Sequence, residues 1–155
     1  MSLRYVPRLI ALCAGLMIAV SAFGRAPADP WTASQTVHPA DLNKELSNPK
    51  SAPVVLFVGF QRLYAAGHIK GAQYHGTPNK PDGLAELKAW AASLPRTTNL
   101  VIYCGCCPME HCPNIRPAFT ALRDLGFTKL RVLILPTSFE ADWANQGLPY
   151  DKGSS

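Results

Sequence analysis

Four cysteines lie in one short segment of the chain, and they are the residues with the most chemistry to offer. The segment runs from Cys104 to Cys112 and reads CGCCPMEHC, so it also contains a methionine and a histidine. Thiols and imidazoles this close together can serve as nucleophiles, as ligands for soft metal ions or as redox pairs. The fifth cysteine, Cys13, lies far away in an apolar N-terminal run.

The residues around this segment predict a strand before it and a helix after it. Residues 100–103 form a short apolar run, typical of a buried strand, which leads directly into Cys104. Asn114 is a suitable N-cap for the helix that follows. Sites in parallel sheets form beyond the carboxyl ends of strands, and the positive end of a helix lowers the pKa of a nearby thiol. We therefore predict that Cys104 is a nucleophile, with Arg116 and His111 adding positive charge.

Three other uses of the segment have to be weighed. Disulfides are one, but bridges within so short a segment close small loops and stabilise the fold little. Soft side chains also suit copper(I) or zinc, and the candidate metal ligands are Cys106, Cys107, Met109, His111 and Cys112. A dithiol redox protein would pair Cys104 with Cys107, in a Cys-x-x-Cys spacing, or with Cys112.

Strands and helices alternate along the rest of the chain. Strands are expected at residues 53–58, 100–103 and 130–135, and helices at residues 39–46, 61–66, 84–94, 114–125 and 139–145. This alternation predicts an α/β domain with a parallel sheet covered by helices on both faces. His68 lies between two glycines and is expected to be a hydrogen-bonded structural residue, and Trp90 and Trp143 are expected to pack in the core.

The N-terminal segment predicts export. Residues 1–24 have a basic start, an apolar middle and small residues at the end, as in a signal peptide, and residues 25–35 read as a flexible lead-in. Cleavage after Gly24 or Ala28 is plausible, and an uncleaved membrane anchor is the alternative. The mature chain is then expected in the bacterial periplasm or outside the cell, where clustered cysteines need a specific role. Its charges are mixed, so nucleic-acid binding is not expected.

Four motifs, in order, resemble those of rhodanese-like domains. Residues 67–72 (GHIKGA) are similar to the family's Gly-His-Ile-Pro-Gly-Ala signature, and residues 101–104 (VIYC) to the strand that delivers its catalytic cysteine. Residues 125–127 (LGF) resemble the segment after its active-site helix, and Trp143 with residues 147–149 (GLP) resembles its C-terminal ending. The resemblance covers residues 36–151. It implies a three-layer domain with a parallel sheet of about five strands.

The same resemblance implies sulfur transfer, as in thiosulfate sulfurtransferases. Cys104 would carry sulfane sulfur as a persulfide, taken from a sulfur donor and passed to a thiol acceptor, with no cofactor required. The active-site loop would comprise Gly105, Cys106, Cys107, His111, Cys112 and Arg116. This loop is longer than the family's compact cradle, and no cysteine in it begins the Cys-x5-Arg pattern of related phosphatases. Residues 58–62 (VGFQR) also lack the family's usual acidic residue before arginine.

Overall fold

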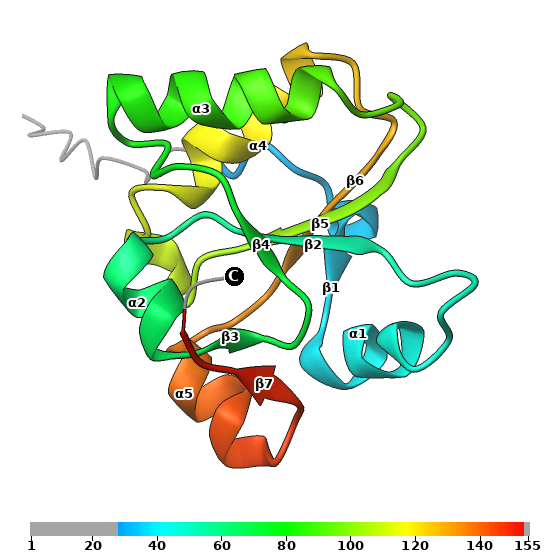
Figure 1. The fold of residues 1–155 in the computed structure, drawn as a ribbon, viewed down its shortest axis with the longest axis vertical. Helices are drawn as coiled ribbons and strands as arrows, with labels where there is room; N and C mark the ends of the chain where they lie inside the picture. The colour runs from blue at the N-terminus through cyan, green and yellow to red at the C-terminus, as the bar shows by residue number, and fades with distance from the viewer. Residues whose placement is uncertain (1–27, 154–155) are drawn as a thin grey trace, which may run out of the picture.

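The computed structural model describes residues 28–153 of the 155-residue chain (Figure 1). Residues 1–24, the expected signal peptide, lie outside this range. The helices are α1 (Pro39–Leu46), α2 (Gln61–Ala66), α3 (Pro81–Ala92), α4 (Ile115–Asp124) and α5 (Phe139–Asp142), with short 3-10 helices η1 (Ala33–Gln35), η2 (Met109–His111) and η3 (Ala144–Gln146). The strands are β1 (Thr36–Val37), β2 (Val54–Phe57), β3 (His68–Ile69), β4 (Gln73–Tyr74), β5 (Asn99–Tyr103), β6 (Lys129–Leu133) and β7 (Tyr150–Asp151).

Five of these strands form one parallel sheet, as predicted. Its strand order is β1-β6-β5-β2-β4, and β5 lies at its centre with β6 on one side and β2 on the other. In β5, residues 100–103 are fully buried, which explains the continuous apolar sequence of that strand. The carboxyl end of β5 therefore lies at the middle of the sheet edge, and Cys104 follows it directly.

Helices cover both faces of the sheet, so the predicted three-layer arrangement is confirmed (Figure 1). Helices α3 and α4 lie on one face, where Leu87 and Phe119 are fully buried against the sheet. Helices α1 and α2 lie on the other face, where Leu42 of α1 and Trp143 are fully buried. Burial of apolar area on both faces is the main force that holds this arrangement together.

The short strands are the elements that the sequence pattern did not reveal. Strands β1, β3, β4 and β7 have two residues each, too few for a recognisable alternation. Strand β3 lies within the motif of residues 67–72 and pairs antiparallel with β7 near the end of the chain. Helix α3 begins earlier than predicted, at Pro81, because proline is favoured in the first turn of a helix. The predicted final helix is divided at Trp143 into α5 and η3.

The lead-in to the domain is more ordered than the flexible segment we predicted, over the part that the structure describes. Trp31 packs edge-on against Phe119 of α4, with ring centroids 5.4 Å apart. Asp29 forms an ion pair with Arg116, with 2.6 Å between the oxygen and nitrogen atoms. The aromatic contact and the ion pair are both made with α4, so they hold this stretch against that helix.

His68 and Trp143, which lie in two of the motifs, have the structural roles that we expected. His68 Nδ1 is 2.8 Å from the carbonyl oxygen of Tyr64, and the two rings stack with centroids 3.8 Å apart. Trp143 Nε1 donates a hydrogen bond to the carbonyl oxygen of Pro149 at 2.9 Å. Nδ1 of His68 and Nε1 of Trp143 thus each have a hydrogen-bond partner inside the fold.

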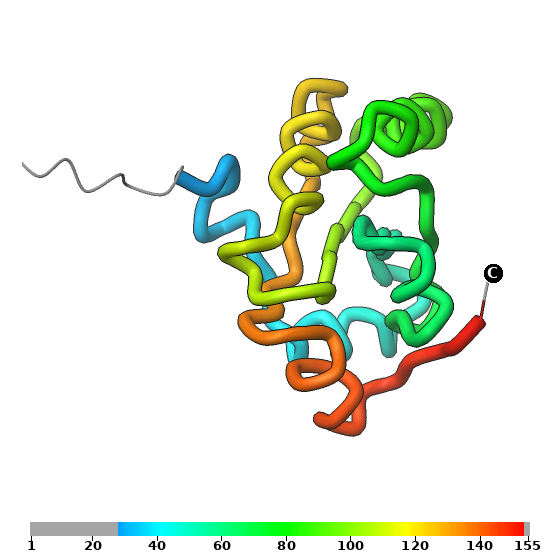
Figure 2. The backbone as a smooth tube through the Cα atoms, turned by 90° about the vertical axis from the view of Figure 1, so that its left-hand side faces the viewer, coloured from blue at the N-terminus to red at the C-terminus, as the bar shows by residue number. Residues whose placement is uncertain are grey.

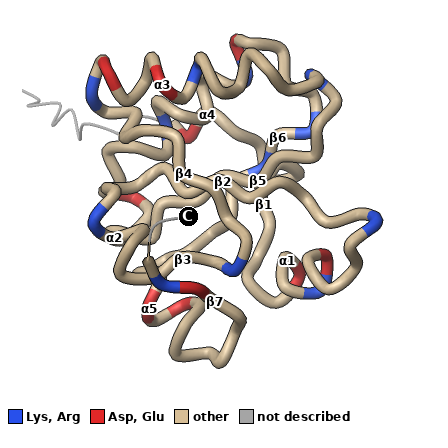
Figure 3. The backbone as a smooth tube through the Cα atoms, in the orientation of Figure 1, with Lys and Arg blue, Asp and Glu red and all other residues tan. Residues whose placement is uncertain are grey.

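The charged side chains are spread over the surface. Figure 3 shows lysine and arginine interspersed with aspartate and glutamate on α1, α3 and α5 with β7. Within residues 28–153, no helix has the length and apolar character needed to cross a membrane.

Candidate active site: a cluster of three thiols

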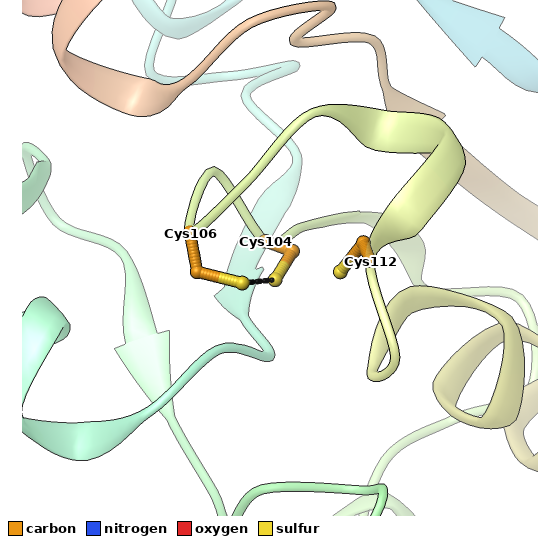
Figure 4. Close-up of side chains that lie close together, drawn as sticks. All are labelled: Cys104, Cys106 and Cys112. Atoms are coloured by element: carbon orange, nitrogen blue, oxygen red, sulfur yellow. Dashed lines mark hydrogen bonds between the residues drawn. The ribbon is translucent and has the colours of Figure 1, made fainter.

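Three cysteine sulfurs converge just beyond the carboxyl end of β5 (Figure 4). The Sγ atoms of Cys104, Cys106 and Cys112 all lie within 4.8 Å of one another, and those of Cys104 and Cys106 are 3.0 Å apart. The cysteines are free thiols. Cys104 and Cys112 are buried, while Cys106 is half-buried. We call these three residues the thiol cluster.

The loop turns sharply after Cys104, and this turn brings Cys106 back onto it. Gly105 has a φ of 71°, in the left-handed region that favours glycine. Its carbonyl oxygen accepts a hydrogen bond from the backbone N–H of Phe139 at 3.0 Å, and that of Pro136 accepts one from Met109 at 3.4 Å. In Figure 2 the loop accordingly runs beside the segment that follows β6. The cluster is therefore held by backbone contacts from a distant part of the chain.

The positive end of α4 acts on Cys112 rather than on Cys104, so our prediction about Cys104 was wrong on this point. Thiol hydrogen bonds from Cys104 and Cys106, together with the backbone N–H groups of Asn114 and Ile115, lower the pKa of Cys112 to about 3. The pKa of Cys104 is raised, because its proton is shared with Cys106 and Cys112 and because the side chain is buried. Cys112 thus holds the negative charge of the cluster, while Cys104 Sγ is hydrogen-bonded to Cys106 Sγ at 3.0 Å.

The remaining two thiols, Cys106 and Cys107, differ in position, because only Cys106 belongs to the thiol cluster. The hydrogen bond from Cys104 lowers the pKa of Cys106, but the bond to Cys112, burial and the neighbouring Cys107 outweigh it and raise the pKa to about 12. Cys107 Sγ lies 3.4 Å from Cys106 Sγ and does not reach the other two sulfurs closely enough to join the cluster. Burial raises the pKa of Cys107. The Cys104–Cys107 spacing seen in the sequence is therefore not the closest pair, which is Cys104 with Cys106.

The polar partners of Arg116 and His111 are groups other than the three thiols. Arg116 donates to the carbonyl oxygens of Met109 and Glu110, both at 3.3 Å, and pairs with Asp29. Its charge is balanced there, and its guanidinium holds the shape of η2. His111 is largely exposed and lies 3.2 Å from the Glu110 carboxylate. The positive charge predicted to act on the thiols comes instead from the backbone of α4.

Asn114 takes up a position that the sequence analysis interpreted differently. It precedes α4, as expected for an N-cap, but its side chain makes no capping hydrogen bond. Its Oδ1 accepts a hydrogen bond from the backbone N–H of Asn79 at 3.2 Å instead. Its Nδ2 is buried with no partner among the described residues. No local pattern could reveal this link, because Asn79 lies in a separate loop.

The structure brings together only part of the predicted metal ligand set. Cys106 and Cys112 lie close together, and Cys104, which was not in that set, joins them. Met109 packs against the core instead, and His111 is in solvent. Three thiols at this spacing suit a soft ion, because thiolate ligands select copper(I) and zinc.

Comparisons with known proteins identify the fold. No family model matches the chain, and no curated protein matches its sequence. Among solved structures, the rhodanese-like domain of the Alr3790 protein from Anabaena is 23% identical, with a TM-score of 0.56, covering 76% of this chain and 79% of that one. The BH2092 protein from Bacillus halodurans is 21% identical, with a TM-score of 0.60 and 77% of each chain covered.

A thiosulfate sulfurtransferase from Pseudomonas aeruginosa is 22% identical, with a TM-score of 0.57 over 84% of this chain. The match covers only 21% of that protein, so the present chain corresponds to about a fifth of it. With its five-stranded parallel sheet and flanking helices, the protein has the rhodanese fold, as the sequence motifs predicted. The cluster lies where those motifs place the catalytic cysteine, at the end of β5.

Proposed function

We propose that this protein is an exported sulfurtransferase that carries sulfane sulfur as a persulfide on Cys104. The observation that carries the proposal is the thiol cluster at the carboxyl end of the central strand, in front of α4. The fold it shares with a thiosulfate sulfurtransferase supports the reaction class. Export is supported by the sequence of residues 1–24 and fits a role for unpaired thiols outside the cytosol.

The chemistry divides into two substitutions. In the first, the Cys104 sulfur attacks the outer sulfur of a donor such as thiosulfate. The donor's S–S bond breaks, its electron pair leaves with sulfite, and Cys104 becomes a persulfide. In the second, a thiol acceptor attacks the outer sulfur and releases the Cys104 thiolate. No electrons are gained or lost overall by the protein, so no redox cofactor is needed.

Cys112 supplies the base for the first substitution. Its Sγ atom lies within 4.8 Å of Cys104 Sγ, so the Cys112 thiolate can take up the Cys104 proton as Cys104 attacks. The backbone N–H groups of Asn114 and Ile115 hold the charge on Cys112 before the proton arrives. Cys104 is then the sulfur carrier, and Cys112 is the group that activates it.

Sulfite release from thiosulfate, in the presence of a thiol acceptor, tests the proposed reaction. Cys104→Ser should abolish sustained release beyond one equivalent, and Cys112→Ser should reduce it by about 100-fold, the usual contribution of a positioned base. Cys107→Ser removes a neighbouring thiol outside the cluster and should leave release unchanged. Release by the Cys104 variant at the wild-type rate would contradict the proposal. Recovery of the protein from the periplasm or medium, shortened at Gly24 or Ala28, tests export.

A second function is favoured by the spacing of the sulfurs. The three Sγ atoms lie within 4.8 Å of one another, close to the span of a trigonal thiolate site, in which metal–sulfur bonds of about 2.3 Å place the sulfurs about 4 Å apart; Cys104 and Cys106, at 3.0 Å, would move apart to bind an ion. Three ligands favour copper(I) over zinc, which takes four in structural sites. Metal analysis of protein purified without chelator tests this reading. Protein that holds neither ion, and takes up neither when reduced, would remove it.

A further inference from the structure

An open cavity of about 400 Å³ adjoins the active-site loop, and it reaches only one member of the thiol cluster. It lies between α2, the loop and α5, and the residues that line it include Phe57, Leu63, Cys106, Phe139, Tyr150 and Lys152. Cys104 and Cys112 do not line this cavity and are only 2% and 3% exposed. A volume of this size is typical of small-molecule sites. A sulfur donor in the cavity therefore meets Cys106 first.

Cys106 is also held in contact with the buried sulfur that it shields. The Gly105 turn places the two Sγ atoms 3.0 Å apart, and Figure 4 draws the hydrogen bond between them as a dashed line. The hydrogen bond from Phe139 to Gly105 fixes this turn, and a side chain on Gly105 would bring its Cβ to 2.7 Å from that of Phe139. Direct attack by Cys104 on a donor in the cavity would require this fixed turn to open.

We infer that Cys106, in place of Cys104, attacks the donor and then passes the sulfane sulfur to Cys104; the inference rests on the proposed function, in which Cys104 is the sulfur carrier. First, the Cys106 sulfur attacks the outer sulfur of the donor, whose S–S bond breaks; the electron pair leaves on sulfite or a thiolate, and this leaving group takes up the Cys106 proton. Then the Cys104 sulfur attacks the outer sulfur of the Cys106 persulfide. The bond between that sulfur and Cys106 Sγ breaks, and the released Cys106 sulfur takes the proton from Cys104.

This second step conserves every atom and electron. A persulfide anion on Cys106 and a thiol on Cys104 become a thiol on Cys106 and a persulfide anion on Cys104, with no oxidant or reductant. Because the two sulfurs are already in contact, the step requires only a rotation of the Cys106 side chain. Cys106 is therefore a second catalytic residue, placed between the cavity and the buried carrier.

The test follows the position of the sulfur in the reduced, full-length protein mixed with thiosulfate. Persulfides are trapped by alkylation at successive times and located by peptide mass spectrometry. In the wild type, sulfur should appear on Cys106 before Cys104. In Cys104→Ser it should stay on Cys106, and in Cys106→Ser the loading of Cys104 should slow by about 100-fold. Ser93→Ala, in the exposed turn that ends α3, is the control and should load like the wild type.

The outcomes separate this inference from the proposed function. If Cys104 gains sulfur without delay in the wild type, and at an unchanged rate in Cys106→Ser, the relay is wrong while Cys104 remains the carrier. If sulfur appears on neither cysteine of the wild type, the proposed function itself fails. The wild-type time course does not depend on the folding of any variant, and circular dichroism shows whether each variant folds.

Discussion

The backbone N–H of Phe139 donates a hydrogen bond to the carbonyl oxygen of Gly105, with 3.0 Å between the two atoms. This bond ties the first helix after β6 to the turn between the two contacting cysteines. Together with the φ of 71° at Gly105, it determines where the Cys106 sulfur lies relative to Cys104. The geometry of the cluster thus depends on a residue that has no reactive group.

Gly105→Ala should therefore damage both stability and chemistry. The new Cβ would lie 2.7 Å from Phe139 Cβ, in addition to the cost of a left-handed φ for alanine, which is about 1–2 kcal/mol. Gly126→Ala is the matched control, because Gly126 has a φ of 91° and open space around it. Urea unfolding and sulfite release measure the two effects. We expect both variants to lose stability and only Gly105→Ala to lose activity; equal activity in both would show that the turn does not place the sulfurs.

The low pKa of Cys112 predicts a thiolate that persists in acid. Its ordinary value of 9.0 falls to about 3 in the folded protein. A lowered pKa stabilises the folded state above the ordinary value, and this contribution declines as the pH falls from 9.0 to about 3. The ultraviolet absorbance of the reduced protein at pH 6 should show one thiolate, which Cys112→Ser removes and Cys107→Ser retains. Absence of that absorbance in the wild type would place the charge elsewhere.

Two substitutions of Arg116 separate the effect of its hydrogen bonds from the effect of its charge. If the guanidinium serves to hold the carbonyl groups of η2, Arg116→Lys keeps the charge but loses the two bonds that shape the loop. We expect Arg116→Lys and Arg116→Gln each to lose about 1–2 kcal/mol and to leave the thiolate absorbance at pH 6 unchanged. A lower thiolate absorbance in Arg116→Gln alone would restore the role in charge that the sequence analysis predicted.

A pH-dependent contribution to the stability of the fold is expected between α1 and β6, far from the thiol cluster. Glu45 binds Arg131 through two bonds of 2.8 and 2.6 Å. These bonds lower the pKa of Glu45 from its ordinary value of 4.5. The stabilisation is therefore fully present above pH 4.5 and is lost as the pH falls through the lowered pKa. Glu45→Gln should cost about 0.5–1 kcal/mol at pH 7 and less at pH 3, because the pair is partly exposed. Glu86→Gln, on the exposed side of α3, is the control; an equal loss at both pH values would contradict the pairing.

The fold could be predicted because its central strands and long helices leave strong patterns. The apolar run of β5, the amphipathic spacing of α4 and four motifs in order were sufficient to define a parallel sheet and to place Cys104 at its edge. The two-residue strands were missed because their pairing is long-range and leaves no local alternation.

The internal geometry of the site could be predicted only in part. The sequence places four cysteines in one loop, but their sulfurs are sorted by a turn at Gly105 and a contact from Phe139, which lies beyond another strand. For the same reason the helix end was assigned to Cys104, although the backbone N–H groups reach Cys112. The sequence also predicts that Arg116 adds positive charge at the thiols, because no local pattern shows that Arg116 pairs with Asp29. Contacts between distant segments decide these roles.

The mass of the wild-type protein after a single reaction with thiosulfate tests the central claim most directly. Reduced protein is mixed with the sulfur donor, separated from it, and the modified peptide is mapped after alkylation of the free thiols. We predict a gain of one sulfur atom that comes to rest on Cys104 and is lost when a thiol acceptor is added. A protein that gains no sulfur, or gains it at a cysteine other than Cys104 and holds it there, would contradict the account.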